Sequence, residues 1–122
     1  MSQNTDTVNR YLDGFRSNDH AQILSCLTDD ITWTVFGAFR LHGKEAYDAA
    51  IDGAPEFIDP PELAVVRMVE QGDVVMAELT GMARRSAGGE MRMSMAEVFV
   101  MRGGKIAERR AWVTVLGENE YR

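Results

Sequence analysis

One carboxylate stands within an otherwise apolar stripe of this sequence. Residues 91–101, MRMSMAEVFVM, have the apolar and β-branched content of a strand. Because side chains on a strand alternate between two faces, Glu97 shares a face with Met93, Met95 and Phe99. A carboxylate on a buried face needs a partner, or its pKa shifts. Glu97 is therefore the first candidate for acid–base chemistry.

Two glycine-bearing connections predict which residues lie beside Glu97. A two-residue turn at 103–104 places Arg110 opposite Glu97, and a four-residue loop at 86–89 places Glu78 opposite it on the preceding strand. Directly opposed residues share a face, with side chains about 5 Å apart. The predicted Glu78–Glu97–Arg110 row could titrate as a coupled unit, as acid–base catalysis requires. A structural row of ion pairs has the same composition, so both interpretations stay open.

The same register assigns the remaining residues to the two faces of the sheet. On the face of Glu97 it collects large side chains that could line a pocket for a hydrophobic small molecule. These are Met76, Met82, Met93, Met95 and Trp112, with Thr114 beyond them. The opposite face, which includes Ala77, Leu79 and Ala111, is small and smooth, which permits close packing against another flat surface. A slip of one residue at either turn would exchange the two faces.

The elements that position these residues follow from the spacing of apolar side chains. Between Thr5 and Ser17, apolar residues recur at the i, i+3, i+4, i+7 positions of an amphipathic helix, and Tyr11 lies on this stripe. Further helices are predicted at 20–27 and 43–51, with a strand at 31–36. From residue 63 onward, four strand patterns separated by short turns predict an antiparallel meander. This order predicts one α+β domain over residues 1–122, with helices packed on one face of a sheet.

Composition excludes several classes of function. The chain carries a net charge of −6 and has a pI near 4.8, which argues against binding to nucleic acid or anionic membranes. No apolar run approaches the roughly 20 residues of a membrane span, and the polar first residues predict a cytoplasmic protein. The single cysteine, Cys26, fits a reducing compartment. With two histidines and no His/Cys cluster, we expect neither a metal site nor another cofactor.

Three segments together resemble the nuclear transport factor 2-like superfamily, in its SnoaL-like and ketosteroid isomerase-like branch. They are YLDGFRSNDHAQILSCLTDDITW at 11–33, LHGKEAY at 41–47 and EVFVMRGGKIAERRAWV at 97–113. The resemblance covers nearly the whole chain. It implies a cystatin-like fold, in which a cone-shaped, curved antiparallel sheet wraps around the N-terminal helices. It also implies a homodimer that forms through the open face of the sheet.

In ketosteroid isomerase-like relatives, a tyrosine of the first helix donates a hydrogen bond to an oxyanion, and Tyr11 matches that position. Their second donor is a protonated aspartate two residues before a strand phenylalanine. Glu97, before Phe99, matches it if the following hairpin is one residue shorter here. The catalytic base of those enzymes falls on Val35, which cannot accept a proton.

Two other enzyme types of the superfamily also match only in part. SnoaL-type polyketide cyclases use a last-strand aspartate that falls on Thr114. Limonene epoxide hydrolase relatives use an Asp-Arg-Asp group. Glu78, Arg110 and Glu97 resemble this group only in composition, as two acidic residues and one arginine. Because each mechanism lacks a member, the resemblance implies a pocket without assigning a reaction.

The pocket of the resembled family predicts further contacts. Trp33 and Val35 match cavity-facing positions of the first strand, and His42 lies at a strand-to-helix junction near the opening. We predict catalytic roles for Glu97, Tyr11, Arg110 and Glu78. The predicted substrate-binding residues are Trp33, Val35, His42, Met76, Met95, Phe99, Trp112 and Thr114.

The sequence thus predicts a cofactor-independent isomerase, cyclase or hydratase/hydrolase that acts on a hydrophobic cyclic or polyketide-like compound. The alternative is a non-catalytic ligand-binding or dimerisation domain, in which the Glu-Arg row is structural. Missing bases at Val35 and Thr114 favour this alternative. A third option is a protein-binding role like that of the transport-factor members. The predicted loops contain no large hydrophobic motif that would support it.

Overall fold

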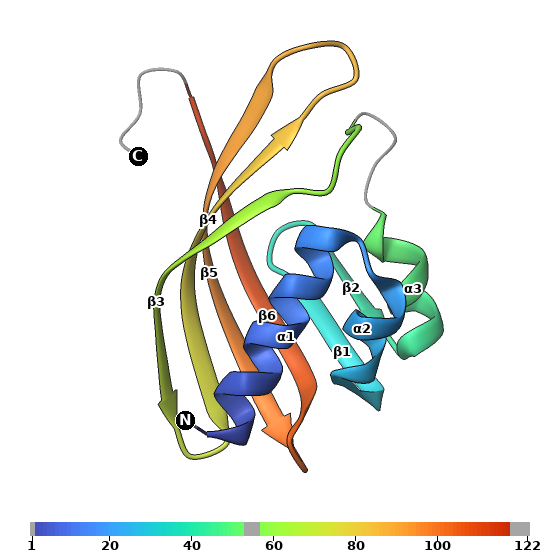
Figure 1. The fold of residues 1–122 in the computed structure, drawn as a ribbon, viewed down its shortest axis with the longest axis vertical. Helices are drawn as coiled ribbons and strands as arrows, with labels where there is room; N and C mark the ends of the chain where they lie inside the picture. The colour runs from blue at the N-terminus through green and yellow to red at the C-terminus, as the bar shows by residue number, and fades with distance from the viewer. Residues whose placement is uncertain (1, 53–56, 118–122) are drawn as a thin grey trace.

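The computed structural model describes residues 2–52 and 57–117 and shows helices packed against a curved sheet (Figure 1). The helices are α1 (Gln3–Ser17), α2 (His20–Ser25) and α3 (Lys44–Ile51). The strands are β1 (Leu27–Val35), β2 (Phe39–His42), β3 (Glu62–Gln71), β4 (Val74–Arg84), β5 (Glu90–Arg102) and β6 (Lys105–Leu116). They form one six-stranded sheet in the order β2-β1-β6-β5-β4-β3. The predicted α+β fold, with a curved sheet around N-terminal helices, is confirmed.

The helix boundaries follow from capping residues. The Ser2 side chain accepts a hydrogen bond from the Thr5 backbone N–H at 3.1 Å and starts α1. Asn18, in the left-handed conformation with φ 53°, ends that helix. Asp19 then caps α2 by accepting from the Gln22 N–H at 3.0 Å. Two adjacent residues thus close one helix and open the next.

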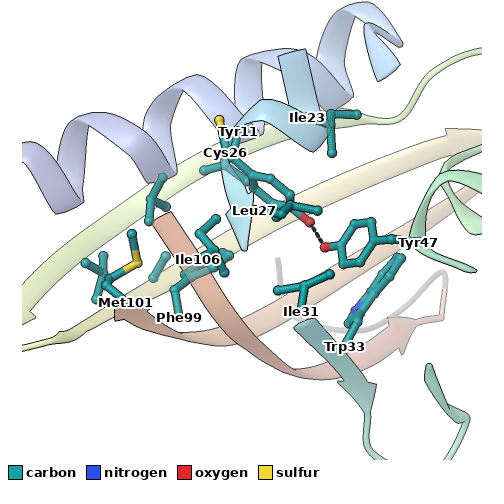
Figure 2. Close-up of a cluster of buried hydrophobic side chains, with 14 of the residues drawn as sticks. Tyr11, Ile23, Cys26, Leu27, Ile31, Trp33, Tyr47, Phe99, Met101 and Ile106 are labelled. Atoms are coloured by element: carbon teal, nitrogen blue, oxygen red, sulfur yellow. Dashed lines mark hydrogen bonds between the residues drawn. The ribbon is translucent and has the colours of Figure 1, made fainter. Parts of the chain in front are cut away.

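One pair of neighbouring strands departs from the predicted antiparallel arrangement. β1 runs parallel to β6, while the other neighbouring pairs are antiparallel. A parallel pair needs a long crossover connection. The chain between β1 and β6 includes α3 and three strands, so it meets this need. The core lies between α1 and the concave face of the sheet, where Leu27, Ile31 and Ile106 pack below the helix (Figure 2).

The apolar stripe of β5 faces this core as predicted, but the register of β6 is different. Met101 opposes Ile106, whereas Val100 opposes Glu108, so Ala107 is an extra residue in a β-bulge. Beyond the bulge Glu97 opposes Ala111, and Arg110 opposes Val98 on the outer face. The predicted Glu97–Arg110 pair is therefore wrong.

The connection between β4 and β5 is also longer than predicted. Arg84, rather than Arg85, opposes Glu90, because Arg85 leaves the ladder and closes a turn onto Gly89. Glu78 consequently opposes Ala96 and lies on the outer face. The predicted Glu78–Glu97 pair is therefore wrong as well.

The one-residue shifts exchange the faces of β4 and β6. Ala77, Leu79 and Ala111, expected on a smooth outer face, are buried in the core. Met76 and Trp112, expected in the pocket wall, are 49% and 42% exposed. Thr114 is exposed too. A register slip moves a whole strand's side chains together, because alternation has a period of two residues.

Candidate functional site

Glu97 is buried, and its partner is Arg109. The two residues are 2% and 9% exposed. Arg109 Nε donates to Glu97 Oε1 at 2.6 Å, and Nη2 donates to Oε2 at 2.9 Å. This two-point geometry gives strong, directional hydrogen bonds. It also offsets the cost of taking both charges out of water.

Two tyrosines from different helices complete this polar cluster. Arg109 Nη1 donates to the Tyr11 hydroxyl on α1 at 2.6 Å and lies 3.4 Å from the Tyr47 hydroxyl on α3. The two hydroxyl groups are hydrogen-bonded to each other, as the dashed line in Figure 2 shows. Both tyrosines are fully buried. We refer to Glu97, Arg109, Tyr11 and Tyr47 as the polar cluster.

Aromatic rings surround the Arg109 guanidinium. Its central carbon lies 4.3 Å from the ring centroid of Trp33 and 5.4 Å from that of Phe15. Trp33 in turn stacks on Tyr47, with centroids 4.8 Å apart. A cation over an aromatic face is attracted to it, and more strongly where water is excluded. Glu97 and these rings together hold Arg109 in a defined position.

Burial determines the protonation state of the cluster. It raises the pKa of Tyr11 well above its ordinary value of 10.0, and the positive charge of Arg109 offsets this only in part. Burial likewise raises the pKa of Tyr47. Burial alone would lower the pKa of Arg109, but the charge of Glu97, the two tyrosines and the hydrogen bond to Glu97 together outweigh burial and keep Arg109 protonated. At neutral pH the cluster therefore contains two neutral phenols beside a guanidinium cation.

The hydrogen-bond count leaves donors to spare. Two phenols carry two hydroxyl protons, and their mutual hydrogen bond uses one of them. Among the described residues, the other neighbour of these hydroxyls is Arg109, which can only donate. One phenol proton therefore lacks an acceptor within the described part of the chain. The buried Trp33 Nε1 has no hydrogen-bond partner there either. The site is thus rich in donors and poor in acceptors.

A cleft of about 220 Å³ lies between the C-terminal end of α1, the C-terminal end of α3 and residues 57–61. The surface that the cleft exposes is mostly polar, and its lining includes the polar side chains Asn18, Asp52 and Asp59. The remaining lining residues are Phe15, Ile51, Phe57, Ile58, Pro60 and Pro61. Phe15 and Ile51 also pack against the buried core. These two side chains connect the cleft with the interior.

The structure brings together only part of the predicted site. Tyr11, Glu97 and Trp33 meet around Arg109, and Met95 and Phe99 belong to the same core. Phe99 lies edge-on to Tyr11, with ring centroids 5.7 Å apart. Val35 is partly buried and packs against that core.

The other predicted residues lie on the outer face of the sheet. Arg110 pairs with Glu108 at 3.2 Å, and Glu78 pairs with Arg67 at 2.9 Å. His42 is exposed beside Thr32, with its Nδ1 3.1 Å from the threonine hydroxyl. Met76, Trp112 and Thr114 are exposed as well. These six residues do not touch the polar cluster.

Arg109 and Tyr47 are the two members that the sequence reasoning missed. Arg109 is adjacent to the predicted Arg110, so only the bulge separates the two assignments. Tyr47 and Ile51 are the buried residues of α3 and are spaced as the inward stripe of that helix. A helical projection of residues 44–51 would have placed Tyr47 in the interior.

Metal and membrane features can be assessed for residues 2–52 and 57–117. Within these ranges, no three or more His, Cys, Asp or Glu side chains are grouped so as to hold a metal ion. No helix in the same ranges is long and apolar enough to cross a membrane.

The SnoaL-like domain model matches residues 8–109 of the chain. No curated protein matches significantly. Among solved structures, an LEH-like epoxide hydrolase from M. tuberculosis shares 18% identity with a TM-score of 0.81, covering 92% of this chain and 83% of that one. A proposed SnoaL-like polyketide cyclase from Jannaschia sp. CCS1 shares 18% identity with a TM-score of 0.81, covering 91% and 85%. TerC, co-crystallised with polyporic acid, shares 23% identity with a TM-score of 0.81, covering 90% of each chain.

Proposed function

The chain belongs to the SnoaL-like domain family, and from this premise we propose that it binds a hydrophobic cyclic or polyketide-like small molecule. The ligand enters through the cleft and places an oxygen atom against the polar cluster. Similarity in fold to an epoxide hydrolase and to a proposed polyketide cyclase is consistent with a small-molecule ligand. That similarity does not select a reaction, because one fold hosts many chemistries.

The observation that carries this proposal is the excess of buried donors. A spare phenol proton and the unpartnered Trp33 Nε1 lie in the same aromatic cluster as the Arg109 cation. A buried donor without an acceptor is costly, so it needs a reason to persist. A ketone, phenol, enolate or epoxide oxygen would accept from these groups.

If the protein is an enzyme, the cluster stabilises negative charge that develops on the ligand oxygen. The phenol with the spare proton donates to that oxygen, while the fixed Arg109 cation lies close by. Isomerisation, cyclisation and epoxide opening all pass through such an oxygen-centred charge. Glu97 acts here as a positioning residue, since both of its oxygens accept from Arg109. The acid–base role predicted for Glu97 would require one of these hydrogen bonds to break.

A second candidate is ligand binding without catalysis. Val35 matches the position of the catalytic base in ketosteroid isomerase-like enzymes and cannot accept a proton, and Thr114 is exposed on the outer face of the sheet. Among the described residues, the carboxylate within the cluster is Glu97, and it is fully engaged. These facts favour a carrier or sensor that recognises the oxygen without removing a proton from the ligand.

Paired probes test the role of the polar cluster. 2-Naphthol and naphthalene differ by one hydroxyl group, and their dissociation constants would be measured by fluorescence titration. We expect 2-naphthol to bind at least tenfold more tightly than naphthalene. Tyr11→Phe combined with Tyr47→Phe should reduce this preference about fivefold, in line with one lost hydrogen bond of about 1 kcal/mol, because either single change leaves one phenol proton without an acceptor. Equal affinity for the two probes in the wild-type protein would contradict the proposal.

We also propose that two copies of the chain associate through the outer face of the sheet. The face differs from the smooth one expected from the sequence. It presents Val69, Met76 and Trp112, which are 58%, 49% and 42% exposed. Exposed apolar patches of this kind often mark interfaces. Analytical ultracentrifugation of the wild type and of Met76→Glu tests this association, since the charge should produce a monomer.

A further inference from the structure

The ring of Phe15 lies between the cleft and the polar cluster. This side chain lines the cleft on its outer side. On its inner side its ring centroid lies 5.2 Å from that of Tyr11 and 6.3 Å from that of Trp33. The guanidinium carbon of Arg109 is 5.4 Å from the same ring. Phe15 thus contacts the cluster and the cleft at the same time.

We propose that Phe15 is the gate of this site and that its ring occupies the position of the ligand's polar head group. This inference rests on the proposed function and extends it by naming the residue that controls entry and the size of the head group. When the ring swings aside, the cleft becomes continuous with the hydroxyl groups of Tyr11 and Tyr47. A single six-membered ring that carries an oxygen would replace the ring of Phe15.

Phe15 is better suited to movement than the neighbouring wall residue. Ile51 is 7% exposed, and a β-branched side chain in a helix has one strongly preferred rotamer. Phe15 is only partly buried and lies in the last turn of α1, which ends at Ser17. Its rotation therefore leaves the helix backbone in place, and Glu97 and Trp33 still hold Arg109. Tyr11, one turn earlier, is fully buried and held by Arg109.

The gate has a consequence for affinity. If a ligand binds only the open state, its apparent dissociation constant equals the intrinsic one divided by the fraction of molecules that are open. Removing the ring removes this penalty and joins its space to the cleft of about 220 Å³. An engineered apolar cavity of about 150 Å³ is enough to bind benzene in another protein. The space freed by Phe15→Ala differs from such a cavity because it ends in hydrogen-bond donors.

The experiment compares phenol and toluene, two one-ring probes of similar shape, by isothermal titration calorimetry. For Phe15→Ala we expect phenol to bind at least tenfold more tightly than it binds the wild type, and more tightly than toluene binds the variant. Ile106→Ala is the matched control, because Ile106 is fully buried and lies outside the cleft. It should not gain affinity for phenol. Replacing both Tyr11 and Tyr47 by Phe in the Phe15→Ala background should remove most of the gain, because it removes both phenol protons.

The outcomes separate the two proposals. If Phe15→Ala binds phenol no better than the wild type, while an oxygen preference remains, Phe15 is not the gate. If Phe15→Ala binds toluene and phenol equally well, the donors do not recognise oxygen and the proposed function fails. Should Phe15→Ala not fold, as judged by circular dichroism, Phe15→Leu retains an apolar side chain and should show a smaller gain. Absence of any gain in a folded Phe15→Leu would then overturn the gate.

Discussion

Replacing Glu97 by Gln should cost this protein a large part of its stability. The change removes a carboxylate that accepts two charge-assisted hydrogen bonds, at 2.6 and 2.9 Å. Gln can accept only one of them, and its amide N–H₂ would face another donor of Arg109. The guanidinium would then be a buried cation without a counter-charge. Breaking a buried ion pair in this way costs about 3–5 kcal/mol.

Urea denaturation followed by circular dichroism would measure this loss of unfolding free energy. For a domain of this size, about 3–5 kcal/mol corresponds to a fall in Tm of roughly 10–20 °C. Glu78→Gln is the matched control. Glu78 lies on β4, on the outer face of the sheet, and the change breaks its exposed ion pair with Arg67 of β3. Surface pairs contribute about 0–1 kcal/mol, so this variant should remain close to the wild type.

A double variant distinguishes the loss of the pair from the exposure of a lone charge. Glu97→Met combined with Arg109→Met removes both charges and fills their space with apolar side chains. Replacing a buried pair by apolar residues is often neutral or stabilising, so the double variant should be much more stable than Glu97→Gln. The reasoning would be refuted if Glu97→Gln cost no more than Glu78→Gln. It would equally be refuted if the double variant were as unstable as Glu97→Gln.

Three further perturbations test other parts of the structure. Arg109→Gln should destabilise the protein by about 3–5 kcal/mol, whereas Arg110→Gln should cost less than about 1 kcal/mol, and urea denaturation would compare them directly. Gly14→Ala should destabilise by about 1–3 kcal/mol despite its better helix propensity, because the new Cβ would lie 2.7 Å from Ile23 Cγ1; thermal melts would show it. His20 bridges the carboxylates of Asp48 in α3 and of Asp52, the residue that follows α3, and their hydrogen bonds raise its pKa above the ordinary 6.5. Its contribution is therefore present below about pH 6.5 and lost as pH rises through the raised pKa, so wild-type stability should fall above that pH more than the stability of His20→Gln.

Much of the fold could be predicted because local patterns and tertiary packing agree. The apolar stripe that includes Tyr11 and Phe15 matches the buried face of α1, and the alternation around Glu97 matches β5. The order of helices and strands then leaves few ways to cover one sheet face. The parallel pairing of β1 with β6 was missed because it joins distant segments, which no local pattern reports.

The candidate site could be predicted only in part, since it depends on two elements that meet in space. Glu97 stood out as a charge within an apolar stripe. Its neighbours depended on the hairpin register, where one extra residue changes every partner. Tyr47 comes from α3, whose contact with the first helix is not encoded in the spacing of either segment. The patterns therefore identified which residues face inward on single elements, while the constellation required the packed structure.

The bulge at Ala107 explains why Arg109, rather than Arg110, reaches the core. In a regular hairpin, Ile106 would face inward beside Met101, and strict alternation would then bury Glu108 next to Phe99 and Arg110 next to Glu97. A second carboxylate would enter the core with only one guanidinium to compensate it, at a high desolvation cost. With the extra residue, Ile106 and Arg109 both face inward, and Glu108 turns outward to pair with Arg110. The small Ala111 then lies opposite Glu97 and leaves room for the guanidinium. The odd spacing between Ile106 and Arg109 is thus the feature that selects one charge pair for the interior, and the bulge is its structural consequence.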